Sequence, residues 1–340
     1  MSDIHIRIEG QAGRITLTRP KALNAVTYDM CIAIETALDQ WRDDDAVTLV
    51  ILDAEGDKAF SAGGDIADLY ATGKAGDFAF GQKFWRDEYR MNAKIHEYAK
   101  PIVSFLQGFT MGGGMGVGCH GSHRIVGETS QIAMPEVGIG LVPDVGGSLI
   151  LAGAPGHLGT YAATTGARMN AGDAITIGFA DMFIPQDKWP GLIETLVKTG
   201  NVEILQGKPA PDGVITPQKV EIDQHFGAAT LPDLLASLRA SDSEFAQKTL
   251  KTLLRNSPLS MAYTIEMMQR LKGITDIRAA LQLEYRFTFR AMEHGDFIEG
   301  IRAAIIDKDR RPNWRHDADD LPQTAIDTML APLGDNALTF

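Results

Sequence analysis

Two carboxylates that follow a block of glycines are the residues of this chain best suited to chemistry. Residues 110–118 read Thr-Met-Gly-Gly-Gly-Met-Gly-Val-Gly, and Glu136 and Asp144 follow, eight residues apart. Glycine has no side chain, so a ligand can approach its backbone N–H groups closely. A carboxylate can act as acid, base or nucleophile. Together they supply what an enzyme acting on a carbonyl needs, namely donors for an oxyanion and a group for the covalent or proton step.

The sequence around both carboxylates is apolar. Glu136 stands in the run Ala133–Ile139, and Asp144 in the run Leu141–Gly147. Apolar surroundings raise the pKa of a carboxyl group and make it useful near neutral pH. Two structural interpretations compete with a functional one. Acidic residues usually lie on the surface, and Asp144 is also a suitable N-cap for a helix.

A second glycine loop, Ala62-Gly63-Gly64-Asp65, strengthens the functional interpretation. Like the block at Gly112–Gly114, it follows a predicted buried strand. Loops after neighbouring parallel strands gather at one edge of a sheet, where ligands usually bind. Backbone N–H groups of the two loops can therefore converge on one oxygen. A helix beginning near Gly113 would add its dipole to the stabilisation of negative charge.

Two other motifs are interpreted as accidental or structural. Gly116–Gly121 matches the dinucleotide fingerprint G-x-G-x-x-G, with Glu136 near the expected distance. However, this run is expected inside a helix, and Pro135 fits poorly in a central strand. Cys119 and His120 are adjacent, so their side chains point apart, and both are interpreted as packed residues.

Strands and helices alternate over residues 1–190, which predicts an α/β domain. Alternating isoleucines predict a hairpin at 4–17, and Thr27 is expected to cap the helix that follows. The remaining predicted elements are strands at 47–52, 101–106, 123–126, 131–133 and 182–184, a long helix at 78–98, and helices near 148, 161 and 171–178.

The second half of the chain is predicted to be helical. Residues 191–230 are expected to be a connector, because most of this range is rich in glycine, proline and polar groups. Helices are predicted over 231–317, with Ser257 and Thr275 as N-caps. Residues 318–340 are expected to form a loosely held tail.

Composition excludes several classes of partner. The 340 residues are 44% hydrophobic and carry a formal net charge of −12, which makes nucleic acid a poor partner. No apolar run reaches the ~20 residues of a membrane span. The N-terminal residues resemble neither a secretory signal nor a transit peptide. With two cysteines no disulfide framework is possible, and a soluble protein of the cytoplasm is expected.

The motifs resemble the crotonase superfamily, which is also called the enoyl-CoA hydratase/isomerase superfamily. The resemblance rests on Arg19-Pro20-Lys21-Ala22-Leu23-Asn24-Ala25 together with both glycine loops. It implies a ββα spiral core followed by a helical C-terminal region, and a coenzyme A thioester as substrate. It also implies an oxyanion hole from the N–H groups of Gly64 and Gly113. The residues implied to contact the substrate are Lys21, Ala22 and Leu23, against the nucleotide end of coenzyme A, and Ala62.

The chain is most similar to the 3-hydroxyisobutyryl-CoA hydrolase family within that superfamily. The motifs are Ala-Met-Pro-Glu at 133–136, Pro-Asp-Val-Gly-Gly at 143–147 and, in the second half, segments 257–260, 284–286, 296–303 and 307–309 with Trp314. A segment at 84–89 resembles the one whose glutamate lies near the substrate, which nominates Glu88.

The resemblance implies hydrolysis of a short branched 3-hydroxyacyl-CoA, with Glu136 as nucleophile or general base and Asp144 orienting the substrate or water. Hydratases of the superfamily use a second glutamate, whose position is taken here by Gly116. An isomerase or unusual hydratase is the alternative, followed by a catalytically silent acyl-CoA-binding protein. No metal and no cofactor are expected, because coenzyme A is part of the substrate. The chain is expected to be a monomer or a trimer-based homo-oligomer.

Overall fold

The computed structural model describes residues 3–340, which divide into two compact units. Unit 1 comprises the residues up to Asp65 together with Asp87–Ala133 and Arg168–Val214. Unit 2 comprises Ile66–Arg86, Met134–Ala167 and Ile215–Phe340. The chain therefore changes unit several times, whereas the division predicted from the sequence consists of consecutive ranges.

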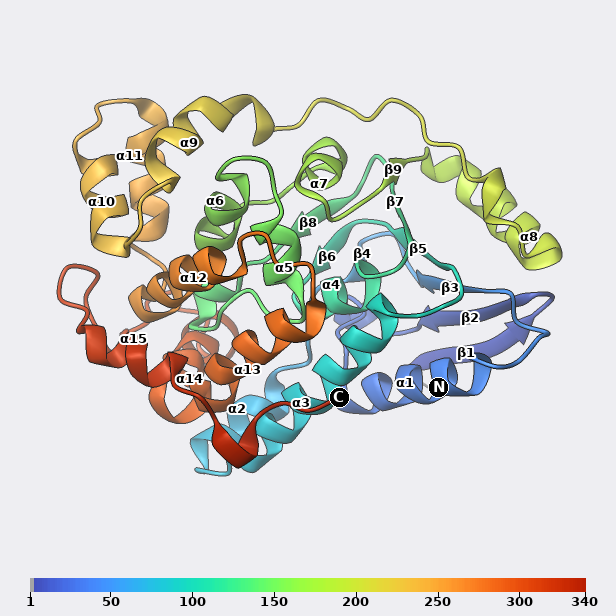
Figure 1. The fold of residues 1–340 in the computed structure, drawn as a ribbon, viewed down its shortest axis with the longest axis horizontal. Coiled ribbons are helices and arrows are strands. Elements are labelled where there is room, and N and C mark those ends of the chain that lie inside the picture. The colour runs from blue at the N-terminus through green and yellow to red at the C-terminus, as the bar shows by residue number, and fades with distance from the viewer. Residues whose placement is uncertain (1–2) are drawn as a thin grey trace. The chain divides into compact units, whose positions relative to one another are not determined.

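Unit 1 is built on a six-stranded sheet in the order β1-β2-β3-β5-β7-β9 (Figure 1). The predicted hairpin is confirmed, because β1 pairs antiparallel with β2, while the other neighbours pair in parallel. Every residue from Leu49 to Asp53 is buried, as expected for a central parallel strand. The bounds are Ile4–Glu9, Ala12–Leu17, Leu49–Ala54, Ile102–Leu106, His123–Val126 and Met182–Phe183 for β1, β2, β3, β5, β7 and β9.

Helices α1 (Tyr28–Trp41) and α8 (Trp189–Thr199) pack on this sheet. Thr27 caps α1 as predicted, since its side chain accepts a hydrogen bond from the N–H of Met30. Trp189 and Leu196 of α8 join the core formed by the sheet. Unit 1 also contains the second part of α3 (Ala79–His96), α4 (Gly113–Gly118), α7 (Ala171–Ile177) and the 3-10 turns η1 (Pro20–Ala22), η3 (Gln186–Lys188) and η4 (Val202–Ile204).

A second, three-stranded sheet of unit 1 delivers the two glycine loops. It consists of β4 (Ala59–Ser61), β6 (Phe109–Met111) and β8 (Gln131–Ala133), paired in parallel in that order. Because β4 and β6 are parallel neighbours, the loops that follow them leave the sheet at the same edge. Helix α4 begins directly after the second loop, and Gly112 before it adopts a φ of 46°, which favours glycine.

Unit 2 is largely helical. Ser257 caps α12 as predicted, because its side chain accepts a hydrogen bond from the N–H of Ser260. The prediction for Thr275 is wrong by one residue, since Asp276 caps α13 and accepts from the N–H of Arg278. The elements, besides the first part of α3, are α2 (Ala67–Lys74), η2 (Glu136–Ile139), α5 (Gly147–Ala152), α6 (Leu158–Thr165), η5 (Thr216–Gln218), α9 (Lys219–Phe226), α10 (Leu231–Arg239), α11 (Glu244–Leu253), α12 (Pro258–Leu271), α13 (Ile277–His294), α14 (Phe297–Ile301), η6 (Arg302–Ile306), α15 (Gln323–Leu330) and η7 (Gly334–Asn336).

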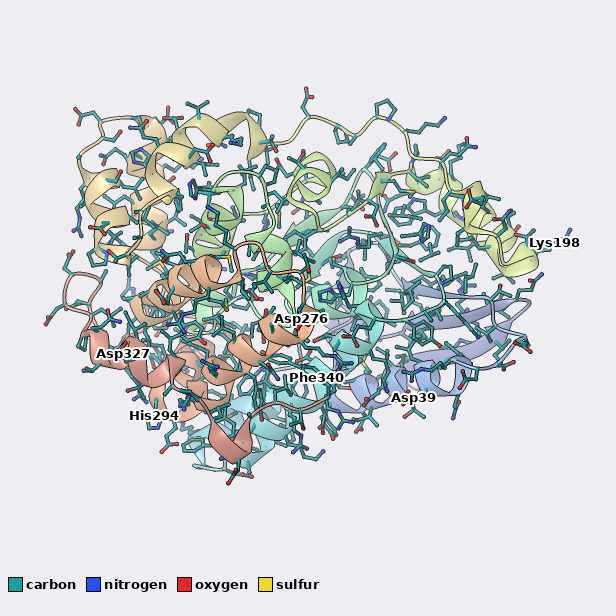
Figure 2. All side chains as sticks on the ribbon, viewed as in Figure 1. Asp39, Lys198, Asp276, His294, Asp327 and Phe340 are labelled. Carbon is teal, nitrogen blue, oxygen red and sulfur yellow. The ribbon has the colours of Figure 1, made fainter. Side chains whose placement is uncertain are left out.

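Two segments expected to be irregular contain helices. Residues 191–230 include most of α8 and all of α9. The supposed tail contains α15, which packs on α13. Arg290 of α13 donates to the carbonyl of Ala331, 2.8 Å away. The ring centre of Phe340, which is labelled in Figure 2, lies 5.2 Å from Cζ of the Arg278 guanidinium. These partners come from a distant helix, so the local sequence does not reveal them.

Candidate active site

The first glycine loop of unit 1 is fixed by the segment that carries the Arg-Pro-Lys motif. The N–H of Ala62 donates to the carbonyl of Leu23 at 3.0 Å, and Val26 pairs with Gly64 as an isolated parallel bridge. That bridge uses the carbonyl of Gly63 and the N–H of Asp65. The N–H of Gly64 takes no part in this pairing, which leaves it available to a ligand.

Gly64, Gly113 and Glu88 lie together in unit 1. A methyl group added to Gly113 would lie 3.2 Å from the backbone nitrogen of Gly64 and 2.9 Å from Oε1 of Glu88. The two backbones therefore approach each other more closely than a side chain at position 113 allows. Glu88 is only 3% exposed, so it is a buried residue of α3 and not a solvated one. The structure thus brings together three residues that the sequence nominated separately.

The predicted substrate-binding segment borders the same loop. Lys21 and Ala22 are exposed, while Leu23 adopts a left-handed φ of 51°. The next residue, Asn24, is buried and holds the turn. Its side chain accepts from the N–H of Arg19 and donates to the carbonyls of Glu55 and Ala59. Asn24 belongs to the sequence motif Arg19–Ala25, but no role was predicted for it. An asparagine beside a proline turn was the available signal.

In unit 2, both predicted catalytic carboxylates are buried. Glu136 opens the 3-10 turn η2 and is 5% exposed, and Asp144 is 4% exposed. Burial raises the pKa of Glu136 well above its usual value, and the charge of Asp144 raises it further. Oε2 of Glu136 is buried with no hydrogen-bond partner among the described residues. A carboxyl oxygen in that state is suited to meet a substrate or a water molecule.

Neither structural interpretation of Asp144 holds. It is not a surface carboxylate, because it is buried. It is also not the N-cap of α5, since Gly146 occupies that position with a φ of 80° and no side chain caps the helix. Val145 between them also has a positive φ, of 50°. The turn before α5 is therefore tightly wound, and it carries Asp144 at its start.

A third carboxylate, Glu284, belongs to this cluster and was not predicted. It lies on α13 and is fully buried. It accepts hydrogen bonds from the N–H groups of Gly146 and Ser148, at 2.9 and 3.3 Å, and from the hydroxyl of Ser148. Burial is the main cause that raises the pKa of Glu284 to about 8. The available signal was a glutamate on a largely apolar helical stripe made of Ile277, Ala280, Leu281, Phe287 and Ala291.

Both cysteines are buried, and Cys31 lies close enough to Glu88 for the charge of that carboxylate to raise the pKa of the thiol, after the larger effect of burial. Burial raises the pKa of Cys119 to about 12 and that of Cys31 well above its usual value, so neither is a thiolate near neutral pH. This agrees with the prediction that Cys119 and His120 are packed residues, since both are buried. Within residues 3–340, no group of three or more His, Cys, Asp or Glu side chains is arranged to hold a metal ion.

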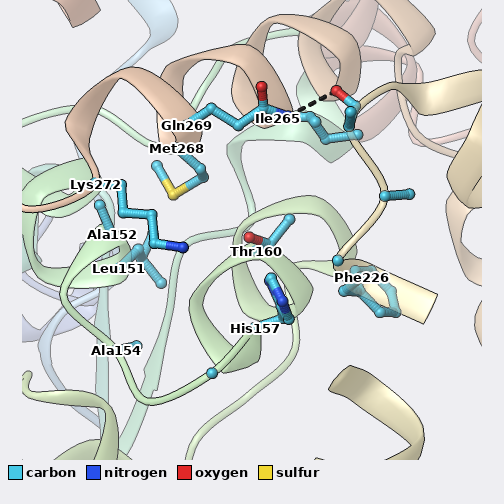
Figure 3. Close-up of a pocket in the computed structure, with 14 residues that line it drawn as sticks. Leu151, Ala152, Ala154, His157, Thr160, Phe226, Ile265, Met268, Gln269 and Lys272 are labelled. Carbon is cyan, nitrogen blue, oxygen red and sulfur yellow. Dashed lines mark hydrogen bonds between the residues drawn. The ribbon is translucent and has the colours of Figure 1, made fainter. Parts of the chain in front are cut away.

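Unit 2 also contains a pocket of about 460 Å³ between α5, α6, α9 and α12 (Figure 3). His157, Thr160 and Lys272 contribute polar groups to its wall, and Phe226 and Met268 contribute apolar ones. Glu136, Asp144 and Glu284 do not line it. The pocket is therefore separate from the carboxylate cluster.

Residues 12–330 match the sequence pattern of the enoyl-CoA hydratase/isomerase family. The chain belongs to this family. Among curated proteins it is similar to the mitochondrial 3-hydroxyisobutyryl-CoA hydrolases of Xenopus tropicalis and Homo sapiens. It is 38% identical to the frog protein, covering 97% of this chain and 89% of the relative. It is 33% identical to the human protein, covering 99% and 91%. The predicted resemblance is confirmed.

Solved structures confirm the predicted fold class. A crystal structure described as an enoyl-CoA hydratase from Rhodobacter sphaeroides is 56% identical, with a TM-score of 0.97 and full coverage of both chains. One described as a carnitinyl-CoA dehydratase from Mycobacterium thermoresistibile is 38% identical, with a TM-score of 0.95, covering 100% of this chain and 99% of that one. The chain has a crotonase-type α/β core and a helical C-terminal region. No helix within residues 3–340 has the length and hydrophobicity that crossing a membrane requires.

Proposed function

We propose that this chain hydrolyses 3-hydroxyisobutyryl-CoA to 3-hydroxyisobutyrate and coenzyme A, a step of valine catabolism. The observation that carries this assignment is the name shared by relatives that are 33–38% identical over nearly the whole chain. The chemistry of the chain is consistent with it, because a thioester hydrolase needs backbone donors, which unit 1 contains, and a buried carboxylate, which unit 2 contains.

The glycine loops supply the donors. The N–H groups of Gly64 and Gly113 bind the thioester carbonyl and stabilise the oxyanion that forms during attack. One such donor is worth about 3 kcal/mol of the activation barrier. The first residue of α4 is Gly113, so the partial positive charge of the helix N-terminus adds to this stabilisation.

The residues around these loops bind the rest of the substrate. Lys21 is exposed and offers its ammonium group to the phosphates of coenzyme A, with Ala22 and Leu23 beside it. Ala62, whose N–H donates a hydrogen bond to the carbonyl of Leu23, lies beside the coenzyme A portion as well. Glu88, beside Gly113, contacts the acyl portion.

Glu136 carries the chemical step by one of two routes. As a nucleophile, its carboxylate attacks the carbonyl carbon, the C–S bond breaks, and water hydrolyses the resulting anhydride. As a general base, it accepts a proton from the water that attacks the carbonyl; the C–S bond then breaks, and the departing thiolate of coenzyme A takes up that proton. Both routes need Glu136 ionised at the moment of reaction, and Asp144 orients the substrate hydroxyl or the water.

Hydration of an enoyl-CoA is the second candidate function, because the 56%-identical solved structure is described as an enoyl-CoA hydratase. The matching position for the second hydratase glutamate is Gly116, which cannot transfer a proton. Thiol release from 3-hydroxyisobutyryl-CoA and from a panel of other acyl-CoA esters, measured beside hydration of crotonyl-CoA, separates the two. Hydrolysis liberates a free thiol and hydration does not. Hydration without thiol release would reject the hydrolase, and binding without turnover would indicate a silent family member.

Location and assembly are also proposed. Two buried cysteines without a disulfide suit a reducing compartment, and we place the chain in the cytoplasm, although relatives are named mitochondrial. Fractionation of the source cells tests this assignment. We expect a monomer or a trimer-based homo-oligomer, which light scattering distinguishes.

A further inference from the structure

The buried carboxyl group of Glu284 binds the turn that follows Asp144. Its hydrogen bonds come from the N–H of Gly146, the N–H of Ser148 and the hydroxyl of Ser148. Glu284 lies on α13, 138 residues away from Gly146 along the chain. Among the described residues, Glu284 accepts hydrogen bonds only from Gly146 and Ser148, which follow Asp144, so its carboxyl group is placed to hold that turn.

The turn needs such support, because two consecutive residues have a left-handed backbone. Val145 has a φ of 50° and Gly146 a φ of 80°. Glycine adopts this conformation readily, but for a β-branched valine it is a rare and strained one. A conformation of this kind persists only where surrounding contacts impose it. The bonds to Glu284 begin at the residue directly after Val145.

We propose that Glu284 is a positioning residue, which holds the turn Pro143–Ser148 in the conformation that places Asp144 beside Glu136. This role rests on the proposed function of Asp144 and Glu136. Glu284 touches neither the substrate nor the reacting atoms in this account. It acts through the backbone of Gly146 and Ser148.

The position of Glu284 also has an electrostatic consequence. Among its titratable neighbours are Asp144 on the turn, Glu136 on η2 and Tyr263 on α12. The charge of Glu284 raises the pKa of Glu136, after the larger effects of burial and of Asp144. Glu284 keeps its proton below its own pKa of about 8, so this effect acts only where Glu284 is ionised, and burial and Asp144 set the pKa of Glu136 in acid.

The test compares the wild-type chain with Glu284→Gln, Ser148→Ala and the control Glu293→Gln. The amide of Glu284→Gln keeps the size of the side chain but turns one acceptor into a donor that faces the turn. Ser148→Ala removes one bond without changing the charge. Glu293 lies on the same helix and its side chain is 54% exposed, so its replacement should change nothing.

Glu284→Gln should lower kcat by about tenfold to a hundredfold, the range that a displacement near 1 Å produces, with KM changed less than threefold. The acid limb of its kcat/KM profile should stay where it is, because Glu284 is already uncharged in acid. Ser148→Ala should lower kcat less and leave the acid limb where it is. Wild-type kcat in a folded Glu284→Gln variant would overturn the inference.

Hydrogen exchange keeps this test independent of the proposed activity. The amide protons of Gly146 and Ser148 should exchange faster in both Glu284→Gln and Ser148→Ala than in the wild type, and at the wild-type rate in Glu293→Gln. Faster exchange in a chain that releases no thiol would reject the proposed function and retain the turn-holding role. Unchanged exchange would reject that role, whatever the activity.

Discussion

Adding one methyl group at Gly113 should separate activity from stability. The new Cβ would lie 2.9 Å from Oε1 of Glu88 and 3.2 Å from the backbone nitrogen of Gly64. Relief of these contacts moves the neighbouring atoms by a few tenths of an ångström. The donors of the oxyanion hole then lose their alignment.

The expected loss of activity and change in stability of Gly113→Ala follow from two separate energies. Misaligning one oxyanion donor costs about 3 kcal/mol, which lowers kcat by about 10²-fold. Alanine, on the other hand, favours a helix over glycine by up to about 1 kcal/mol. Gly113 begins α4 with a φ outside the left-handed range. The gain in helix propensity therefore offsets part of the contact cost, and the variant should fold.

Thiol release and thermal unfolding measure the two effects on the same preparations. Gly191→Ala is the matched control, because Gly191 lies in α8 and an added Cβ there meets no atom within 4 Å. It should keep full activity with equal or higher stability. A folded Gly113→Ala variant with wild-type kcat would refute the role of this loop.

Three further predictions concern the carboxylates and the substrate-binding turn. The pKa of Glu136 is raised, and the reaction needs its ionised form, so kcat/KM should fall in acid with a midpoint above pH 4.5. A pH–rate profile measures that midpoint, which belongs to the coupled Glu136–Asp144 pair, and a midpoint below pH 4.5 would contradict the burial effect. The folded pKa of Glu284, about 8, exceeds its ordinary 4.5. The stability that protonated Glu284 contributes is complete below pH 4.5 and is lost as the pH rises towards 8. In urea unfolding, the free energy of unfolding of Glu284→Gln should therefore decline less between pH 4.5 and 8 than that of the wild type. Asn24→Ala removes an acceptor and two donated bonds and should destabilise the fold by about 2–4 kcal/mol. A shift below 0.5 kcal/mol in urea would contradict that role.

Features encoded in neighbouring residues were predictable from the sequence. The hairpin at the N-terminus, the caps Thr27 and Ser257, and the strands β7 and β8 all have the predicted type and place. Each depends on a cap residue or on alternation within a few positions. The glycine loops were also predictable, because two such loops after buried strands favour parallel neighbours.

Features set by distant residues were not predictable in this way. The burial of Glu88 depends on packing that its own helix does not specify. The contact between Glu284 and the turn at Gly146 joins residues 138 positions apart. Helix α15 looked like a tail because its stabilising arginines lie on α13. The cap of α13 was misplaced because Thr275 and Asp276 are adjacent and both residue types suit that position.

The most direct test of the central claim is single-turnover thiol release from 3-hydroxyisobutyryl-CoA by the wild type and by Glu136→Gln. Glutamine keeps the size of the side chain but can neither attack the thioester nor accept a proton. The wild type should release one thiol per active site, and Glu136→Gln should release none at a measurable rate while folding normally and binding coenzyme A with unchanged affinity. Thiol release at the wild-type rate by Glu136→Gln would contradict the assignment of the reaction to Glu136.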